Sequence, residues 1–172
     1  MPNQIAIIID WYGPFSLQNA KKDVSKNSWN GIYLAIGKTK YMRGRSPIQY
    51  VGIGNLRSRL KEDHHKLKLI IRDRKIWLGD IVSLRIPGPK KKKTDTLLDL
   101  AEWLLVYFLE PPLNDRKRRR PPQREVTLIN RWWKPDDSPR KRRPHPDWPI
   151  LIDYPGIDYP VRVCWSWDRN FT

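Results

Sequence analysis

The sequence predicts an α/β fold, and three features of the chain indicate it. Two short segments, GIYLAIG (31–37) and IQYVGIG (48–54), are rich in β-branched and aromatic residues and are bounded by glycine, as strands often are. A third segment, TLLDLAEWLLVYFLE (96–110), carries apolar residues at helical spacing and stops at Pro111 and Pro112. The length of 172 residues suits a single domain with its own core.

The N-terminal part of the chain leads into the first glycine-bounded segment. Ile5–Asp10 is a β-branched run that fits either a buried strand or a short helix. Gly13 and Pro14 then carry turn chemistry, and a polar stretch follows over 21–30. We expect the strands over 31–37 and 48–54 to pair antiparallel, although their connection is longer than the roughly two to five residues of most hairpins.

Further elements follow in the middle of the chain. Asn55 is expected to cap a helix through LRSRLKEDHHKL, and Ile76–Ile86 alternates like a strand. Thr94 or Asp95 is expected to cap the long helix. Beyond residue 115 the frequent prolines disfavour helix, so basic loops are expected to join short strands. These strands are expected at 126–130, 150–153 and 161–165.

The charge of the chain points to a polyanionic partner. Lys and Arg outnumber Asp and Glu by 34 to 18, which gives a formal net charge of +16. No run approaches the roughly 18 apolar residues of a spanning helix, and the N-terminus lacks the pattern of a signal peptide. We therefore expect nucleic acid rather than a membrane as the partner, and a cytoplasmic location. The lone Cys164 excludes an internal disulfide and a cysteine-based zinc cluster.

Several short motifs occur in a fixed order. GIY (31–33) and YVG (50–52) precede NLRSRL (55–60), and a histidine pair then precedes AEWLLVYFLEPPLN (101–114). In this order, over about residues 30 to 115, the chain resembles the GIY-YIG nuclease family. Pro111 and Asn114 stand nine and twelve residues after Glu102, at the family's offsets. The resemblance implies a small mixed β-sheet flanked by helices. It divides the single domain into an N-terminal elaboration (1–30), a nuclease core (31–115) and a basic Pro/Trp-rich C-terminal extension (116–172).

The resemblance also implies an active site that hydrolyses phosphodiester bonds. Such chemistry needs an activated water and positive charge at the phosphate. Glu102 would hold one Mg²⁺, with Mn²⁺ as a substitute and no small-molecule cofactor, and Arg59 would bind a non-bridging phosphate oxygen. Tyr33 would activate or orient the attacking water, and Tyr50 would donate or relay a proton at the scissile phosphate. Asn114 would orient neighbouring groups.

The histidines depart from the family pattern. The family's histidine sits four residues after the arginine, where this chain has Asp63, and His64 and His65 follow. On a straight helix His64 lies about 140° around the axis from Arg59, so either the helix is interrupted or the histidine role is displaced. His64 is the preferred general base or proton shuttle, His65 is the alternative, and the third possibility is that neither acts. His145, in a proline-rich basic loop, is expected to be exposed.

Basic segments surround the motifs. Residues 38–49 form an insertion relative to compact family members, which is either a longer loop, a finger that contacts DNA or the source of a lysine near the phosphate. Trp132 and Trp133 either stack on bases or belong to the core. The arginine runs of the extension are either solvated or bind phosphates without sequence preference. The candidate nucleic-acid contacts are Lys40, Arg43, Arg45, Arg57, Arg118, Arg119, Arg120, Arg142 and Arg143.

Together these features predict a metal-dependent endonuclease that acts on double-stranded DNA. A type II restriction enzyme is the preferred subtype, because the chain carries elaborations around the core without a recognisable second domain. A homing-type or repair nuclease is one alternative, and a non-catalytic, basic nucleic-acid-binding protein on a nuclease-like scaffold is the other. A homodimer suits cleavage of both strands of a palindromic site, and a monomer that acts twice is the alternative.

Overall fold

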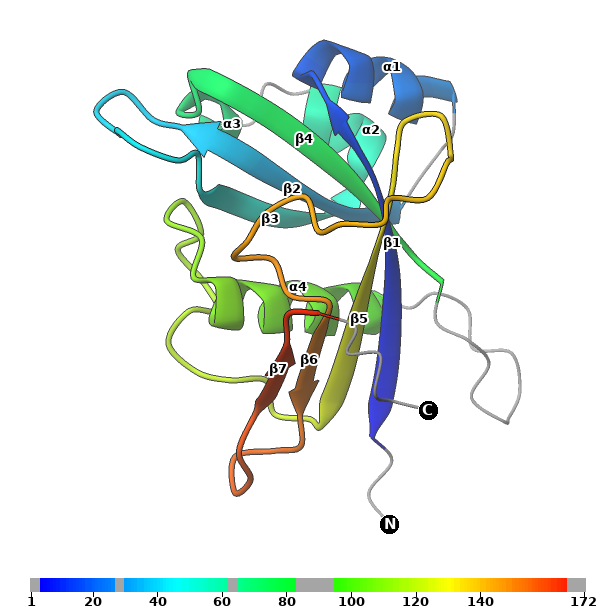
Figure 1. The fold of residues 1–172 in the computed structure, drawn as a ribbon, viewed down its shortest axis with the longest axis vertical. Helices are drawn as coiled ribbons and strands as arrows, with labels where there is room; N and C mark the ends of the chain where they lie inside the picture. The colour runs from blue at the N-terminus through cyan, green and yellow to red at the C-terminus, as the bar shows by residue number, and fades with distance from the viewer. Residues whose placement is uncertain (1–3, 27–29, 62–64, 83–94, 167–172) are drawn as a thin grey trace.

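The fold is mixed α+β, as the sequence predicts, and a computed structural model describes it for residues 4–26, 30–61, 65–82 and 95–166 (Figure 1). The strands are β1 (Ile5–Phe15), β2 (Asn30–Lys38), β3 (Ile48–Asn55), β4 (Arg72–Ile81), β5 (Val126–Trp133), β6 (Leu151–Tyr154) and β7 (Arg162–Cys164). The helices are α1 (Leu17–Lys26), α2 (Leu56–Lys61), α3 (His65–Lys68) and α4 (Asp95–Leu109). Within these described ranges, no helix has the length and apolar character that would let it cross a bilayer.

The strands form one mixed, seven-stranded sheet with the order β3-β2-β4-β1-β5-β6-β7. β2 pairs antiparallel with both β3 and β4, so the two glycine-bounded strands form the expected antiparallel pair. β1 lies in the middle of the sheet, antiparallel to β4 and parallel to β5. The N-terminal segment and the basic C-terminal extension therefore contribute strands to the same sheet as residues 31–115.

Side chains alternate between two cores on opposite faces of the sheet. From β2, Ile32 and Leu34 pack in the larger core with α4, whereas Tyr33 and Ala35 pack in the smaller core with α1 and α2. This alternation follows from the two-residue period of a strand. Figure 1 shows α2 and α4 on opposite sides of β2 and β3. Residues of the GIY motif thus serve both faces of the sheet.

The N-terminal region differs from expectation at the turn and in the polar stretch after it. Of the two alternatives for Ile5–Asp10 the strand is the one present, and β1 continues through the expected turn to Phe15. Its pairing with β4 shifts register between Tyr12 and Phe15, so Gly13 and Pro14 form an irregularity within the strand. The polar stretch then contains α1, which Ser16 caps by accepting a hydrogen bond from the backbone N–H of Asn19 at 3.1 Å.

The other predicted elements are present with adjusted ends. The side chain of Asn55 accepts a hydrogen bond from the backbone N–H of Ser58 at 3.1 Å, so it caps α2 as expected. β4 begins at Arg72, earlier than predicted, because Arg72 pairs with Lys38 at the end of β2. Thr94, one of the two expected caps of α4, and the last residues of the strand predicted over 76–86 lie outside the described residues. β5 runs on to Trp133 because it follows β1 in parallel register.

Candidate active site

The register of β2 and β3 brings the two motif tyrosines together. Tyr33 pairs with Gly52 and Tyr50 pairs with Ala35, which places the tyrosine ring centroids 5.8 Å apart. Tyr33 is 1% exposed, whereas Tyr50 is half-buried. A Cβ atom on Gly52 would lie 2.7 Å from the ring and hydroxyl of Tyr33. The glycine of YVG is therefore needed to seat the tyrosine of GIY.

Both tyrosine hydroxyls remain protonated at neutral pH. Burial raises the pKa of Tyr33 far above its ordinary value, and it also raises the pKa of Tyr50. The two hydroxyls are hydrogen-bonded to each other. Because Tyr33 is buried and Tyr50 is only half-buried, Tyr50 is the one of the two that a ligand can reach.

Arg59 lies on α2, just beyond the end of β3. Its side chain passes Gly54, where a Cβ atom would lie 3.4 Å from Nε of Arg59. Burial is the main cause of the raised pKa of both tyrosines, and the positive charge of Arg59 lowers the pKa of each of them by a smaller amount. Arg59 is itself exposed. An exposed guanidinium near a half-buried phenol is able to bind one phosphate oxygen.

Glu102 lies on α4, on the opposite side of the sheet from α2 (Figure 1). Its side chain is 16% exposed, and its negative charge adds to the burial that raises the pKa of Tyr50. Oε2 of Glu102 lies 2.6 Å from Nζ of Lys117, and the same Nζ lies 2.5 Å from Oδ1 of Asp99. Asp99 is three residues before Glu102, so the two carboxylates share one face of the helix.

The residues around Glu102 fit a hard divalent cation. Two carboxylate oxygens converge on one position that the ammonium of Lys117 fills, and Mg²⁺ commonly binds to one or two carboxylates while keeping several waters. In the part of the chain that the structure describes, no group of three or more His, Cys, Asp or Glu side chains is arranged to hold a metal ion. Asp99 and Lys117 were not among the residues that the motifs indicate.

Asn114 fixes the strand that carries Tyr50. Its side chain is buried, accepts a hydrogen bond from the N–H of Val51 at 2.9 Å and donates one to the carbonyl of Val51 at 2.8 Å. The neighbouring Leu113 N–H donates to the carbonyl of Gln49 at 3.0 Å. Residues 113 and 114 thus pair with the outer edge of β3, on either side of Tyr50.

The three histidines have different positions. His64 lies outside the described residues, so its predicted role stays a prediction. His65 is exposed at the start of α3. The prediction that His145 is exposed is wrong, because its side chain is 6% exposed and its Nε2 lies 2.9 Å from the carbonyl oxygen of Ser46. The proline-rich loop folds back because Trp148, just after it, is fully buried in the larger core.

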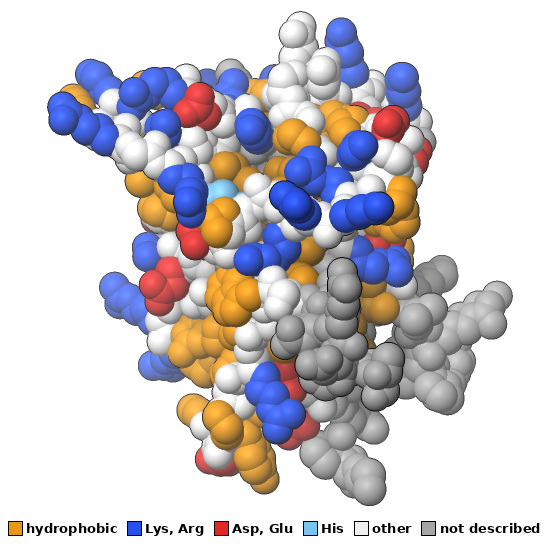
Figure 2. Space-filling model, in the orientation of Figure 1, with side chains coloured by type: hydrophobic (Ala, Val, Ile, Leu, Met, Phe, Trp, Pro, Cys, Tyr) orange, Lys and Arg blue, Asp and Glu red, His pale blue; other side chains and the backbone are white. Residues whose placement is uncertain are grey.

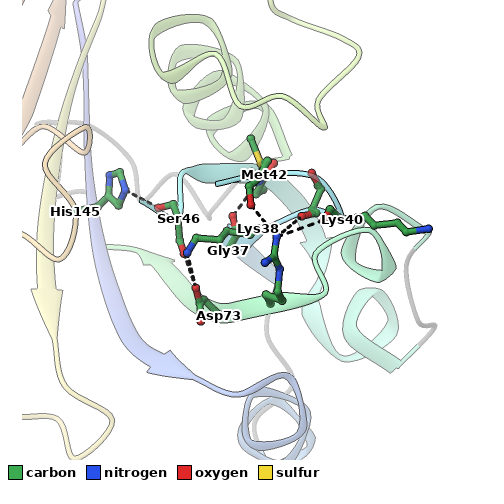
Figure 3. A network of polar contacts seen from close by, with 10 residues as sticks. Gly37, Lys38, Lys40, Met42, Ser46, Asp73 and His145 are labelled. Carbon is green, nitrogen blue, oxygen red and sulfur yellow. Dashed lines mark hydrogen bonds and ion pairs between the residues drawn. The ribbon is translucent and has the colours of Figure 1, made fainter. Parts of the chain in front are cut away.

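Within the 38–49 insertion, residues 39–47 form the loop between β2 and β3, and polar contacts hold it. The guanidinium of Arg72 donates to the backbone carbonyls of Thr39, Lys40 and Met42 at 3.4, 3.3 and 2.7 Å. Asp73 forms an ion pair with Lys38 and accepts a hydrogen bond from Ser46 (Figure 3). The candidate contacts Lys40, Arg43 and Arg45 are exposed on this loop.

The remaining basic candidates occupy three other surfaces. Arg57 is exposed on α2, and Arg118, Arg119, Arg120 and Arg142 are exposed in loops. Arg143 is half-buried over the ring of Trp165, at 5.3 Å from its centroid. Trp132 is buried in the larger core, whereas Trp133 is only half-buried.

Comparisons of the chain with protein-family models, with curated proteins and with solved structures find no match.

Proposed function

We propose that the chain is a metal-dependent endonuclease of the GIY-YIG type that hydrolyses phosphodiester bonds in double-stranded DNA. One observation carries the proposal. Tyr33, Tyr50, Arg59 and Glu102 come from four different elements. The two tyrosine ring centroids lie 5.8 Å apart, the Arg59 side chain passes Gly54 at the end of the same strand pair, and the charges of Arg59 and Glu102 act, after burial, on the pKa of both tyrosines. These residues belong to the motifs whose order along the chain resembles that of the GIY-YIG nuclease family.

The chemistry is divided among these side chains. Arg59 binds a non-bridging oxygen of the scissile phosphate and stabilises the charge that develops there. The Tyr50 hydroxyl orients the attacking water or donates a proton, and Tyr33 acts through it as a positioning residue, because Tyr33 is buried and hydrogen-bonded to Tyr50. Asn114 holds β3 and hence Tyr50 in place. His64 keeps its proposed role as general base or proton shuttle.

Glu102, together with Asp99, would hold the Mg²⁺ ion, with Mn²⁺ as a substitute. When bound, this cation supplies positive charge at the phosphate and makes a coordinated water more acidic. Without the cation, Lys117 neutralises the two carboxylates, and the Lys117 ammonium would leave Glu102 when the cation binds. Two carboxylates that face polyanionic DNA therefore carry a counter-charge in either state.

DNA as the substrate is supported by the distribution of positive charge. The chain has a formal net charge of +16. The segment between β5 and β6 crosses one face of the molecule, and Figure 2 shows Lys and Arg side chains over the middle of that face. Such a surface binds the phosphate backbone in a salt-dependent way. A type II restriction enzyme, located in the cytoplasm and able to act as a homodimer on a palindromic site, is the subtype we propose.

One observation favours a second candidate function. The ion pair between Glu102 and Lys117 is what a non-catalytic DNA-binding protein on this scaffold would use to neutralise the acid. Binding without cleavage is therefore the competing possibility.

Digestion of a long unmodified DNA tests the proposal. The purified protein is expected to cut this DNA with Mg²⁺ and to leave it intact with EDTA. Discrete fragments identify a sequence-specific enzyme, whereas a smear identifies a nonspecific or structure-directed nuclease of the repair type. Intact DNA across a panel of substrates with Mg²⁺, Mn²⁺ and other divalent ions would overturn the proposal in favour of the binding protein.

A further inference from the structure

A separate cationic hollow lies beside the C-terminal end of β5. It has a volume of about 820 Å³ and shares no lining residue with the candidate active site. Its walls are the end of β5 with Trp132 and Trp133, the loop over 139–146, and Trp165 with Ser166 after β7. This volume falls within the range of roughly 300–1,000 Å³ that is typical of sites for small organic ligands.

Positive charge in this hollow is not compensated by acids. Arg140, Lys141, Arg142 and Arg143 all line it, and the described lining contains no Asp or Glu. Arg131 also lines it, but its guanidinium is committed to both carboxylate oxygens of Asp10, at 2.6 and 2.8 Å. Four neighbouring cations without a carboxylate repel one another, so an anionic ligand is the natural occupant.

Two of these guanidinium groups lie over aromatic rings, and one of them also donates to a backbone carbonyl. Arg143 lies 5.3 Å from the ring centroid of Trp165 and donates to the carbonyl of Pro146 at 2.5 Å. Arg140 lies 5.5 Å from the ring centroid of Trp77. Cations that are already ordered lose little conformational freedom when a ligand binds. Arg140 and Arg143 are therefore preorganised, and Lys141 and Arg142 between them are exposed to a ligand.

Aromatic surface lies next to these cations. Trp165 is 45% exposed, and the half-buried Trp133 stacks on Tyr12 with 20° between the ring planes. A flat aromatic surface beside guanidinium groups is the combination that recognises an unpaired base and its phosphate. A base inside a regular duplex is stacked and paired, so it does not enter a hollow of this kind.

We propose that this hollow binds one unpaired nucleotide of a DNA strand, with its base against Trp165 and its phosphate on the exposed Lys141 and Arg142. The inference rests on the proposed DNA substrate, but it does not require cleavage. His145, which lines the hollow, also contacts the carbonyl of Ser46 in the basic loop after β2 (Figure 3). A nucleotide held here would lie beside a second exposed basic segment.

Equilibrium binding of three labelled duplexes by the full chain in EDTA tests the inference. One duplex carries a single extra unpaired nucleotide, the second carries an abasic residue at the same place, and the third is fully paired. Wild type is expected to bind the duplex with the extra base about tenfold more tightly than the abasic one, which is a normal contribution for one stacked base. Trp165→Ala is expected to lose this preference and to keep its affinity for the paired duplex.

Two further variants separate the base from the phosphate. Arg142→Gln is expected to weaken binding of the base-containing and abasic duplexes alike and to lower the salt dependence of both. Tyr159→Ala is the matched control, because Tyr159 is also an exposed aromatic residue but does not line the hollow. It is expected to behave as wild type.

Equal affinity of wild type for the three duplexes would overturn the inference, as would a preference that survives Trp165→Ala. Because Trp165 lies outside both cores and is 45% exposed, its truncation is expected to shift the thermal unfolding midpoint only slightly, which is checked alongside. These outcomes are distinct from the digestion experiment. A protein that prefers the unpaired base but never cuts DNA supports the hollow and refutes the nuclease, and one that cuts without this preference does the reverse.

Discussion

Replacing Lys117 by methionine tests whether the carboxylates of Asp99 and Glu102 form a cation site. The change removes the ammonium that lies 2.5 and 2.6 Å from these carboxylates, and it keeps an unbranched apolar stem. Asp99 is half-exposed, so the loss of its partner costs little. Glu102 is 16% exposed, so leaving its charge unpaired is expected to lower the free energy of unfolding by about 1–2 kcal/mol in EDTA.

Mg²⁺ is expected to reverse that loss. A cation present at about ten times its dissociation constant stabilises the folded state by about 1.4 kcal/mol. In the variant the cation no longer competes with an ammonium, so the variant is expected to gain more stability from Mg²⁺ than wild type does. Urea unfolding of both proteins, with Mg²⁺ and with EDTA, measures this difference.

Lys38→Met provides the matched control. Lys38 is covered to a similar extent, with 21% of its side chain exposed against 20% for Lys117, and it forms an ion pair with the single carboxylate of Asp73 at 3.0 Å. Its variant still carries the Asp99 and Glu102 carboxylates with Lys117, so it is expected to gain the same stability from Mg²⁺ as wild type. If Lys117→Met likewise shows no greater response to Mg²⁺ than wild type, the assignment of a cation to Glu102 and Asp99 is refuted.

Three other variants test the geometry around the tyrosines. Gly52→Ala is expected to destabilise the fold by roughly 1–3 kcal/mol in urea, because its Cβ would lie 2.7 Å from Tyr33, and to cost much less in a Tyr33→Ala background; equal costs would contradict the clash. Asn114→Ala is expected to cost roughly 1–3 kcal/mol and to speed hydrogen exchange at the Val51 amide, since two hydrogen bonds are lost. Unchanged exchange there would contradict a positioning role. Because burial raises the pKa of Tyr33, this hydroxyl stays protonated in the folded state while the unfolded chain ionises above about pH 10, so stability falls with rising pH. Absorbance at 295 nm counts the tyrosines that ionise before the protein unfolds in alkali, and Tyr33→Phe is expected to show the same count as wild type. A count lower by one in the variant would show that Tyr33 ionises in the folded state.

The glycine-bounded strands and the long helix could be predicted because their signals are local. Alternation, glycine boundaries and the cap at Asn55 lie within a few residues of the elements they specify. The helix α1 was missed because its buried residues Leu17, Ala20 and Val24 are few among polar neighbours. The parallel pairing of β1 with β5 joins segments more than one hundred residues apart, and no local pattern encodes it.

The same division applies to the candidate site. The tyrosines, Arg59 and Glu102 could be named as candidates because short motifs mark them in order along the chain. Lys117 was not found, because its ion pairs depend on how the basic segment after α4 folds back, with Trp103 donating to the carbonyl of Arg120. His145 was predicted to be exposed from the prolines around it, but the buried Trp148 anchors that loop to the core. In both cases tertiary packing decides the position of a side chain within a polar, proline-rich segment.

Glu102→Gln tests the proposed activity most directly. The amide keeps the size of the side chain and removes the charge that a divalent cation requires. The measurement pairs the single-turnover cleavage rate of DNA in Mg²⁺ with equilibrium binding of the same DNA in EDTA, and Glu110→Gln, an exposed acid just after the same helix, is the control. Cleavage is expected to fall at least about 100-fold while binding is kept or strengthened, with the control unchanged. Undiminished cleavage by Glu102→Gln would contradict the proposed active site.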